Sequence, residues 1–593
     1  MKKFTLLLIL IIVSLHLYAQ GTHLPLGNEA YHILDRLEIK SAVPSSFHSS
    51  LKYYTRGAAT RYASMLDTMN LDALSLQDRQ DLLYIFRDNN EWLVPSEFYT
   101  TLAGKREKIR ITNQDTLITQ AQASMQDPRY VQSKRPILKY FYKTPANLLE
   151  VNDKYFYLRV NPILNINLSA SNEEPSSLYF NQRGVELRAG VDDRVYFYFN
   201  ILETQAHFPQ YVNDRITRDR SIPGNGFYKD FESNLFGDGQ AYDFLNSQGY
   251  LGFNFTRHLG GQFGYGRNFV GNGYRSLLLS DFGNNYLYFK LNWNVWRFHY
   301  QNLFTELSLQ SARDVPGEEL VPKKYMAAHH LSFNVTKNFN IGLFEAVIFS
   351  RNEGFELQYL NPIILYRTIE QAFGSPDNVL VGIDAKWNLF KRIQFYGQLM
   401  MDEFKFNELF VERNGWWANK FGMQLGAKYI DALGIDHLDL QAELNIVRPY
   451  TYTHTDSLAN YTHYNQTLAH PLGANFREVI LLARYQPIQK LSLEARIISA
   501  NMGEDATGIN WGNNILLANR TRFQDYGNEI GQGVAADIRI VGFDASYQLF
   551  HNVFLDLSYF RRKKTSDDPK LSNSLNYFTG GIRMNIARNR MDF

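Results

Sequence analysis

A two-residue alternation of apolar and polar side chains limits most of this chain to a sheet-based fold. Val379–Leu389 is the clearest case, because every second residue is apolar and most residues between them are polar or small. Ile393–Asp402, Phe421–Tyr429 and Leu438–Ile446 repeat the pattern. Successive side chains of a β-strand point to opposite faces of the sheet, so each segment predicts a strand with one apolar and one polar face.

Composition separates the two architectures that such strands could build. A soluble sandwich buries the apolar face, whereas a membrane barrel turns that face toward lipid. Of the 593 residues 15% are aromatic, yet the mean hydropathy is −0.33, and after residue 20 no stretch approaches the ~20 apolar residues of a membrane helix. We therefore predict a transmembrane antiparallel β-barrel in the outer membrane.

The N-terminus predicts export. Lys2 and Lys3 precede the apolar stretch Leu6–Leu17, and Ala19 offers a small residue for cleavage. Residues 1–20 therefore have the layout of a Sec signal peptide that is removed in the mature protein. The chain contains no cysteine, which excludes a lipidated N-terminal cysteine, disulfide bonds and cysteine-based zinc sites.

A small helical domain is expected between residues 21 and 95. Apolar residues recur at helical spacing in Ala30–Leu37, Ala58–Leu66 and Leu76–Phe86, with Ser75 as an N-cap and Pro44 ending the first segment. Residues 96–153 read as a linker, and residues 154–593 as the barrel.

Loop lengths predict the topology of the barrel. Counting the alternating segments from Tyr155 to Ala587 gives about 18 strands. With an even number of strands, the chain enters and leaves the barrel on the periplasmic side, where the helical domain must also lie. The very short links are Asp192–Asp193, Phe390–Arg392 and Phe550–Asn552, and the long segments are Thr204–Tyr250, Ser350–Asn378, Val447–Arg477 and Asn501–Gly533. Short periplasmic turns that alternate with long extracellular loops are typical of outer-membrane barrels.

The C-terminus adds a further indication. Asn576–Ala587 is predicted to be the last strand, and the chain ends on the aromatic Phe593. An aromatic end after an alternating strand is similar to the signal read by barrel-assembly machinery.

Charges on the inward faces predict an occluded lumen. A charge-selective pore tends to carry rings of one sign, whereas mixed signs in a low-dielectric interior favour mutual pairing. The residues predicted to face the lumen are Asp384, Lys386, Gln398, Asp402, Lys420, Lys428, Asp439 and Glu443. We therefore favour a closed barrel over an open porin.

Several longer strings carry a resemblance to a known family. They are GQFGYGRNFVGNGYRSLLLSDF from Gly261, FEAVIFSRNEGFELQYLNPIILYRTIEQ from Phe344, FYGQLMMDEFKF from Phe395, RPYTYTH from Arg448 and AHPLGANF from Ala469. Together they resemble the capsule-assembly Wzi-like outer-membrane family, and within it the branch named for the gliding-motility protein RemB. AYHILDRLE from Ala30 and YYTRGAATRYASML from Tyr53 resemble one S-layer-homology-type repeat; the alternative is a helical plug with no ligand of its own.

The resemblance implies a non-enzymatic barrel that assembles or attaches capsule at the cell surface, or that takes part in gliding motility. The partners that it implies are outer-membrane lipid, surface polysaccharide, and motility or secretion machinery of the cell envelope. The net charge of +2, without a basic stripe, does not point to nucleic acid. No cofactor is expected.

One loop suggests where a glycan would bind. Arg448–Phe476 is rich in aromatic and histidine side chains, whose ring faces suit sugars; the alternative is that the rings belong to the membrane girdle or to a folded-in plug. The candidate glycan-facing residues are Tyr450, Tyr452, His454, Tyr461 and Tyr464. The histidines show no metal-ligand spacing, so no metal site is expected.

Two other function classes stay open as alternatives. The first is an outer-membrane porin or transport channel, and the second is a barrel-embedded hydrolase. Ser276, Ser280 and His329-His330 lack a surrounding catalytic motif, and GYGRNFVGNG from Gly264 lacks the Lys-Ser/Thr pair of a phosphate-binding loop. We therefore expect no catalytic residues.

Overall fold

The computed structural model describes residues 21–69, 74–93, 98–100, 107–109, 133, 137–153, 155–171, 178–192, 194–233, 237–351, 354–363, 365–374 and 377–593. The predicted signal peptide (residues 1–20) and most of the predicted linker (residues 96–153) lie outside the described residues. No helix among the described residues is long and apolar enough to span a membrane.

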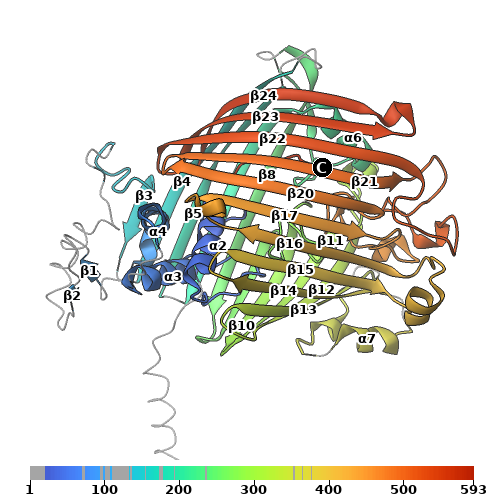
Figure 1. The fold of residues 1–593 in the computed structure, drawn as a ribbon, viewed down its shortest axis with the longest axis horizontal. Coiled ribbons are helices and arrows are strands. Elements are labelled where there is room, and N and C mark those ends of the chain that lie inside the picture. The colour runs from blue at the N-terminus through green and yellow to red at the C-terminus, as the bar shows by residue number, and fades with distance from the viewer. Residues whose placement is uncertain are drawn as a thin grey trace, which may run out of the picture.

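Eighteen long antiparallel strands close into one barrel (Figure 1), which confirms the predicted fold class and strand number. Closure joins β24 to β4 through pairs that run from Tyr577 opposite Ser171 to Met584 opposite Leu164. The strands are β4 (Phe156–Ser171), β5 (Leu178–Val191), β6 (Val195–His207), β8 (Gly237–Asn254), β9 (Leu259–Gly266), β10 (Tyr286–Val295), β11 (Phe298–Ser308), β12 (Lys323–Asn334), β13 (Phe339–Phe349), β14 (Asn378–Leu389), β15 (Ile393–Glu403), β16 (Lys420–Tyr429), β17 (Leu438–Val447), β20 (Phe476–Ile488), β21 (Leu491–Glu504), β22 (Val534–Phe550), β23 (Val553–Ser566) and β24 (Asn573–Met584).

Shorter elements lie beside the barrel strands and in the loops. β3 (Leu149–Asn152) pairs with β4, and β7 (Lys229–Ser233) pairs with β8. β1 (Phe98–Thr100) pairs with β2 (Glu107–Ile109), and β18 (Thr462–His463) pairs with β19 (Gln466–Thr467). The short helices are η1 (Asn90–Trp92), α6 (Gln210–Asp219), η2 (Ala312–Asp314), η3 (Leu357–Leu360), α7 (Tyr366–Ala372), η4 (Asn407–Glu412), η5 (Ala432–Gly434), η6 (Ser457–Ala459), η7 (Asn519–Thr521) and η8 (Pro569–Leu571).

The alternation seen in the sequence becomes two faces of the barrel wall. On β14, Val381, Ile383 and Trp387 are exposed on the outside, whereas Asp384 and Lys386 are buried on the inside. A closed barrel pairs the backbone groups of its strands within the sheet and can therefore stand in lipid. Its exposed apolar side chains then form the lipid-facing surface.

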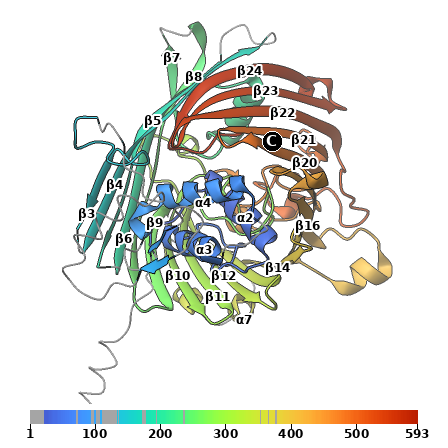
Figure 2. The same cartoon turned by 60° about the vertical axis from the view of Figure 1, so that its left-hand side comes forward.

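The three predicted N-terminal helices are present as α2 (Glu29–Ser41), α3 (Arg56–Met69) and α4 (Leu76–Asp88). Ser75 caps α4 as predicted, and Asp78 completes a capping box by accepting from the Ser75 backbone N–H. The three helices share one apolar core that includes Leu34, Tyr62 and Ile85. Figure 2 shows this helical domain seated within one mouth of the barrel.

One sequence prediction about an irregular segment is wrong. Thr204–Tyr250 is not one long loop: β6 continues to His207, and β8 begins at Gly237. Polar side chains do not prevent ladder pairing, so β8 pairs with β6 from Tyr242 onward and its first residues pair with β7. At the C-terminal end of the predicted linker, β3 extends the sheet by pairing with β4.

The predicted end of the last strand is also wrong. β24 ends at Met584, and Asn585 adopts a left-handed conformation with φ of 56° that turns the chain inward. The tail, defined here as residues 585–593, therefore leaves the sheet, and Phe593 is buried inside the barrel.

Short turns gather at one end of the barrel, where the helical domain also lies. Phe390, Lys391 and Arg392 form the whole link between β14 and β15. Gln77 Nε2 of α4 donates to Gln486 O beside the β20–β21 turn (2.8 Å), and Tyr84 Oη donates to Asn552 Oδ1 in the β22–β23 turn (2.7 Å). Short turns are typically periplasmic in outer-membrane barrels, so the periplasmic location of the helical domain stays a prediction.

Cysteine labelling tests this orientation, because the natural chain contains no cysteine. Lys391→Cys lies in a short turn and Glu319→Cys in the long β11–β12 loop, and both positions are exposed. A membrane-impermeant maleimide should label Glu319→Cys on intact cells, and Lys391→Cys only after the outer membrane is permeabilised. Labelling of Lys391→Cys alone on intact cells would show that the barrel has the opposite orientation in the membrane.

Candidate functional site: the filled lumen

Segments of the chain itself occupy the lumen and contact the inner wall. Each of the eight residues predicted to face the lumen makes a polar contact inside the barrel. The contacts are Asp384–His330 (2.5 Å), Lys386–Glu38 (2.6 Å), Gln398–Leu277 N (2.8 Å), Lys420–Asp402 (3.1 Å), Lys428–Asp35 (2.6 Å), Asp439–Arg36 (2.8 Å) and Glu443–Arg275 N (3.0 Å). Three of these partners belong to α2, so this helix supplies charges that match the wall.

Arg36 of α2 is the most heavily paired of these side chains. Its guanidinium lies 2.9 Å from Asp78 of α4, 2.9 Å from Asp431 in the β16–β17 turn and 2.8 Å from Asp439 of β17. Only 2% of the Arg36 side chain is exposed, so water does not compensate these charges. A buried arginine with three carboxylates ties the helical domain to the wall, and loss of either sign would leave uncompensated charge.

Histidine and aspartate complete the same cluster. Burial alone would lower the pKa of His437, but its hydrogen bond to Asp81, 3.2 Å away, and the neighbouring carboxylate charges outweigh burial and raise that pKa. Burial likewise would raise the pKa of Asp431, but the charge of Arg36 and the hydrogen bond from Lys40 lower it to about 2. Pairing with neighbours of opposite charge therefore favours the charged forms of His437 and Asp431.

The cluster also has the residue types of a cation site. Asp78, Asp81 and His437 bring one possible ligand atom each within reach of a common point. However, the Arg36 guanidinium and the Lys40 ammonium lie 2.9 and 2.5 Å from the Asp78 carboxylate. The positive charge that these carboxylates need is thus supplied by α2 itself.

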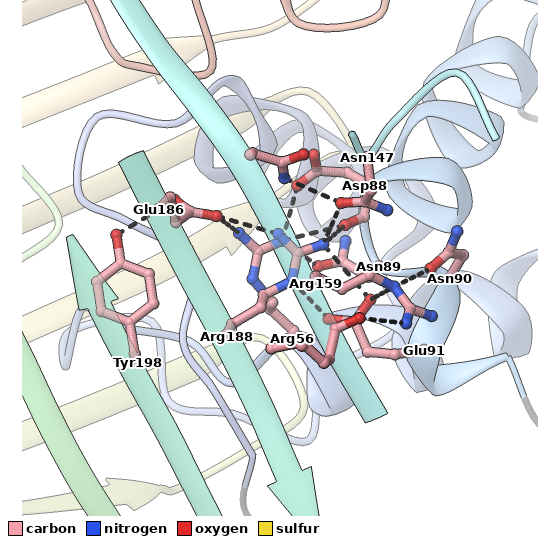
Figure 3. A network of polar contacts seen from close by, with 12 residues as sticks. Arg56, Asp88, Asn89, Asn90, Glu91, Asn147, Arg159, Glu186, Arg188 and Tyr198 are labelled. Carbon is pink, nitrogen blue, oxygen red and sulfur yellow. Dashed lines mark hydrogen bonds and ion pairs between the residues drawn. The ribbon is translucent and has the colours of Figure 1, made fainter. Parts of the chain in front are cut away.

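A second ionic network joins the helical domain to β4 and β5 (Figure 3). Arg188 Nε of β5 donates to Glu91 Oε1 (2.8 Å), and its Nη1 donates to Glu186 Oε1 (3.0 Å). Arg56 of α3 contacts Asp88 (2.8 Å), and Arg159 Nε of β4 donates to Asn90 Oδ1 (2.9 Å). The helical domain is therefore held by buried charges on two sides of the barrel.

The middle of the lumen is apolar. The inner segment, defined here as residues 267–285, crosses the barrel and buries Leu277 and Leu278 completely. Around it, the wall contributes inward apolar residues of several strands, including Leu380, Met400 and Ile480. Apolar inner side chains near the long-loop end are therefore buried against folded-in loops.

A cavity of about 580 Å³ remains at the short-turn end. It extends from the turns at Gln489 and Phe550, along α2, to Gly273 and Tyr274 of the inner segment. Arg588 and Arg590 of the tail form part of its lining. The cavity is a half-channel that stops at the inner segment and the tail.

The tail is fixed inside the lumen by charges and rings. Arg590 contacts Glu494 (2.7 Å), and Asp592 contacts Arg275 of the inner segment (3.2 Å). The Arg215 guanidinium lies 4.6 Å from the Phe593 ring centroid, within cation–π range. The chain end thereby packs between the inner segment and the wall.

The predicted glycan-facing residues lie mostly inside this packing. Tyr450, Tyr452, Tyr461 and Tyr464 are buried, and His454 is partly exposed. Tyr452 and Tyr461 stack with ring centroids 5.8 Å apart, and their hydroxyls donate to Leu277 O and Leu278 O (both 2.8 Å). These rings support the inner segment, so their direct contact with a glycan stays a prediction.

A Ser–His–Asn grouping occurs where no motif predicted one. Ser332 Oγ lies 2.7 Å from His48 Nδ1 and 3.1 Å from Asn340 Oδ1. Ser332 is fully buried, so a substrate cannot reach its hydroxyl in this conformation. The grouping instead attaches the segment after α2 to β12.

Sequence reasoning missed the residues of the helical domain that contact the wall. Asp35, Arg36 and Glu38 are the charges next to Leu34 and Leu37, the apolar positions that placed the helix. Charged residues beside the apolar stripe of a helix were the only local signal. Their partners lie about 350 to 400 residues away in the sequence.

Removal of Arg36 tests how the helical domain is held. Arg36→Met should leave Asp78, Asp431 and Asp439 buried without their main partner, at a cost of about 3–5 kcal/mol. Hydrogen exchange of α2 and α4 amides should then accelerate by at least about a hundredfold. The control is Arg183→Met, whose pair with Glu203 is about half exposed and should change exchange little. Unchanged exchange in Arg36→Met would contradict this account.

Comparison with known proteins bears on the fold. No protein-family model and no curated protein matches the chain. Among solved structures, it is similar to Wzi, an outer-membrane protein involved in group 1 capsule assembly in Escherichia coli and described as a carbohydrate-binding β-barrel. The TM-score is 0.55 at 11% identity, covering 96% of this chain and 99% of Wzi.

Two further similarities are to Pseudomonas aeruginosa OprD and Acinetobacter baumannii OccAB2. Each has a TM-score of 0.40 and covers 72% of this chain; identity is 10% with 94% of OprD covered, and 9% with 97% of OccAB2 covered. The similarity to Wzi confirms the predicted resemblance at the level of fold, and the RemB-like branch stays a prediction. The chain is an outer-membrane β-barrel that shares its overall fold with Wzi.

Proposed function

We propose that this chain is a non-enzymatic outer-membrane barrel that holds capsule-type polysaccharide at the cell surface. The filled lumen is the observation that carries the proposal, because helices, inner segment and tail leave the long loops as the surface available to an outside ligand. Wzi, which has the same overall fold, is described as a carbohydrate-binding barrel of capsule assembly.

The surface that suits a sugar best lies on the β21–β22 loop, residues 505–533. Phe523 and Tyr526 are 54% and 53% exposed there. Between them, Asp525 accepts a hydrogen bond from Arg522 (2.6 Å), whose guanidinium lies 4.1 Å from the Trp417 ring centroid. Exposed ring faces beside charged hydrogen-bonding groups offer both stacking and polar contacts to a pyranose.

The 448–475 loop, which contains the predicted glycan-facing residues, supports the β21–β22 loop through hydrogen bonds. Tyr450 N donates to Gly512 O, and Tyr450 Oη donates to Asn510 O (both 3.0 Å). Asn519 N donates to His454 O (2.9 Å). We propose that the five predicted residues, Tyr450, Tyr452, His454, Tyr461 and Tyr464, hold the glycan-facing loop in place and that His454 is the one nearest to solvent.

The alternatives have less support. Only the half-channel favours a transport channel, and transport through it would require the inner segment or the tail to move. A hydrolase would need access to the buried Ser332. A role in gliding motility or with secretion machinery stays a prediction of the sequence resemblance.

Aromatic substitutions test the proposed glycan surface. Phe523→Ala with Tyr526→Ala should leave the barrel folded and heat-modifiable, because both rings are more than half exposed, and should reduce the polysaccharide retained on intact cells. The matched control is Phe390→Ala, a ring that is 81% exposed at the opposite end of the barrel. If both variants retain the same amount of polysaccharide, the β21–β22 loop is excluded as the glycan site.

Conductance separates the proposal from a transport channel. The purified protein in a planar bilayer should show little steady conductance, because the inner segment and tail block the half-channel. An open porin recorded in the same bilayer is the positive control. Stable, large single-channel steps would favour the channel and overturn the proposal.

A further inference from the structure

Two neighbouring loops at the long-loop end expose apolar side chains instead of burying them. The first loop joins β13 to β14 and the second joins β15 to β16; β14 pairs with β15, so the loops are neighbours on the rim. The outer rim patch is defined here by Leu357, Leu360, Ile363 and Leu365 of the first loop and Phe404, Phe406, Phe410 and Val411 of the second. Their exposed fractions run from 42% to 84%, although side chains of this kind are usually buried.

The second loop forms a small cluster of its own. The ring centroids of Phe406 and Phe410 lie 4.9 Å apart, and that of Phe404 lies 6.1 Å from Phe410. The three rings contact one another, yet Phe406 and Phe410 remain 60% and 52% exposed, and Val411 69%. The cluster therefore presents a shared apolar surface that packing within the loop does not cover.

This surface is continuous with the lipid-facing side of the barrel. Phe395 and Leu399 are exposed on the outer face of β15, and Phe404 follows directly after the end of that strand. Lys405 Nζ lies 5.1 Å from the Trp416 ring centroid at the same level. Lysine and tryptophan at the end of a lipid-facing strand are typical of the membrane interface.

We propose that the outer rim patch inserts into the outer leaflet and anchors this sector of the rim to lipid. Lipid is the occupant that the structure favours, because the patch extends the apolar outer face of β15 and interfacial side chains border it. The anchor would fix the height of the β13–β16 sector in the membrane and would act independently of any glycan bound elsewhere.

Site-directed spin labelling tests the anchor, since the chain has no natural cysteine. Labels at Phe406→Cys and Val411→Cys are compared in vesicles of phosphatidylcholine and phosphatidylglycerol by their collision with oxygen and with a water-soluble nickel chelate. Leu399→Cys is the lipid-facing control. Leu320→Cys is the aqueous control, because Leu320 is an apolar residue in another long loop and is 88% exposed.

The measured quantity is the ratio of the collision rate with oxygen to the collision rate with the nickel chelate. At Phe406 and Val411 this ratio should exceed that at Leu320 and should be similar to that at Leu399. A ratio equal to that at Leu320 would overturn the proposal. Dipolar broadening that disappears on dilution with unlabelled protein would assign the patch to a second copy of this chain and would also overturn it. Heat-modifiable migration confirms that each labelled variant is folded.

Discussion

The pairing of buried charge between the helical domain and the barrel wall is the interaction on which the rest of this structure depends. Arg36 alone contacts three carboxylates from α4, the β16–β17 turn and β17. A barrel wall with inward Asp and Lys side chains would otherwise have to hold water or counter-ions. Because α2 brings Asp35, Arg36 and Glu38 to that wall, these inward charges find their partners within the chain, beside the cavity at the short-turn end.

The lumen has two physical zones as a consequence. Near the short turns the contacts are ionic, and they fix the helical domain in one orientation. Toward the long loops Leu277 and Leu278 are buried among apolar wall residues, as in the core of a soluble protein, and buried pairs such as Lys420–Asp402 lie among them. Ionic pairs specify geometry, whereas apolar burial provides most of the non-directional stabilisation.

A barrel filled in this way is a rigid support for its loops. The Tyr452 and Tyr461 hydroxyls tie the 448–475 loop to the inner segment, and Tyr450 ties the 505–533 loop to the 448–475 loop. Function is then expected on the outer surfaces, where Phe523 and Tyr526 face solvent and the outer rim patch faces outward. Preorganised loops favour binding because little conformational entropy is lost when a ligand arrives.

Local patterns in the sequence determined the architecture. Alternation along strands such as Val379–Leu389 predicted the barrel and its strand number, and helical spacing with the Ser75 cap predicted α2, α3 and α4. These features depend on neighbours two to four residues apart, so one sequence suffices to find them. The inward direction of Asp384 and Lys386 follows from the same period.

Only the tertiary structure decided what those inward side chains meet. Lys386 pairs with Glu38, nearly 350 residues earlier, and no local pattern encodes such a distant partner. Phe593 had the sequence context of a strand end, yet the left-handed turn at Asn585 and the charges of Arg590 and Asp592 place it in the lumen. The tyrosines of the 448–475 loop are buried for the same reason, since burial depends on long-range packing against Leu277 and Leu278 and not on residue type.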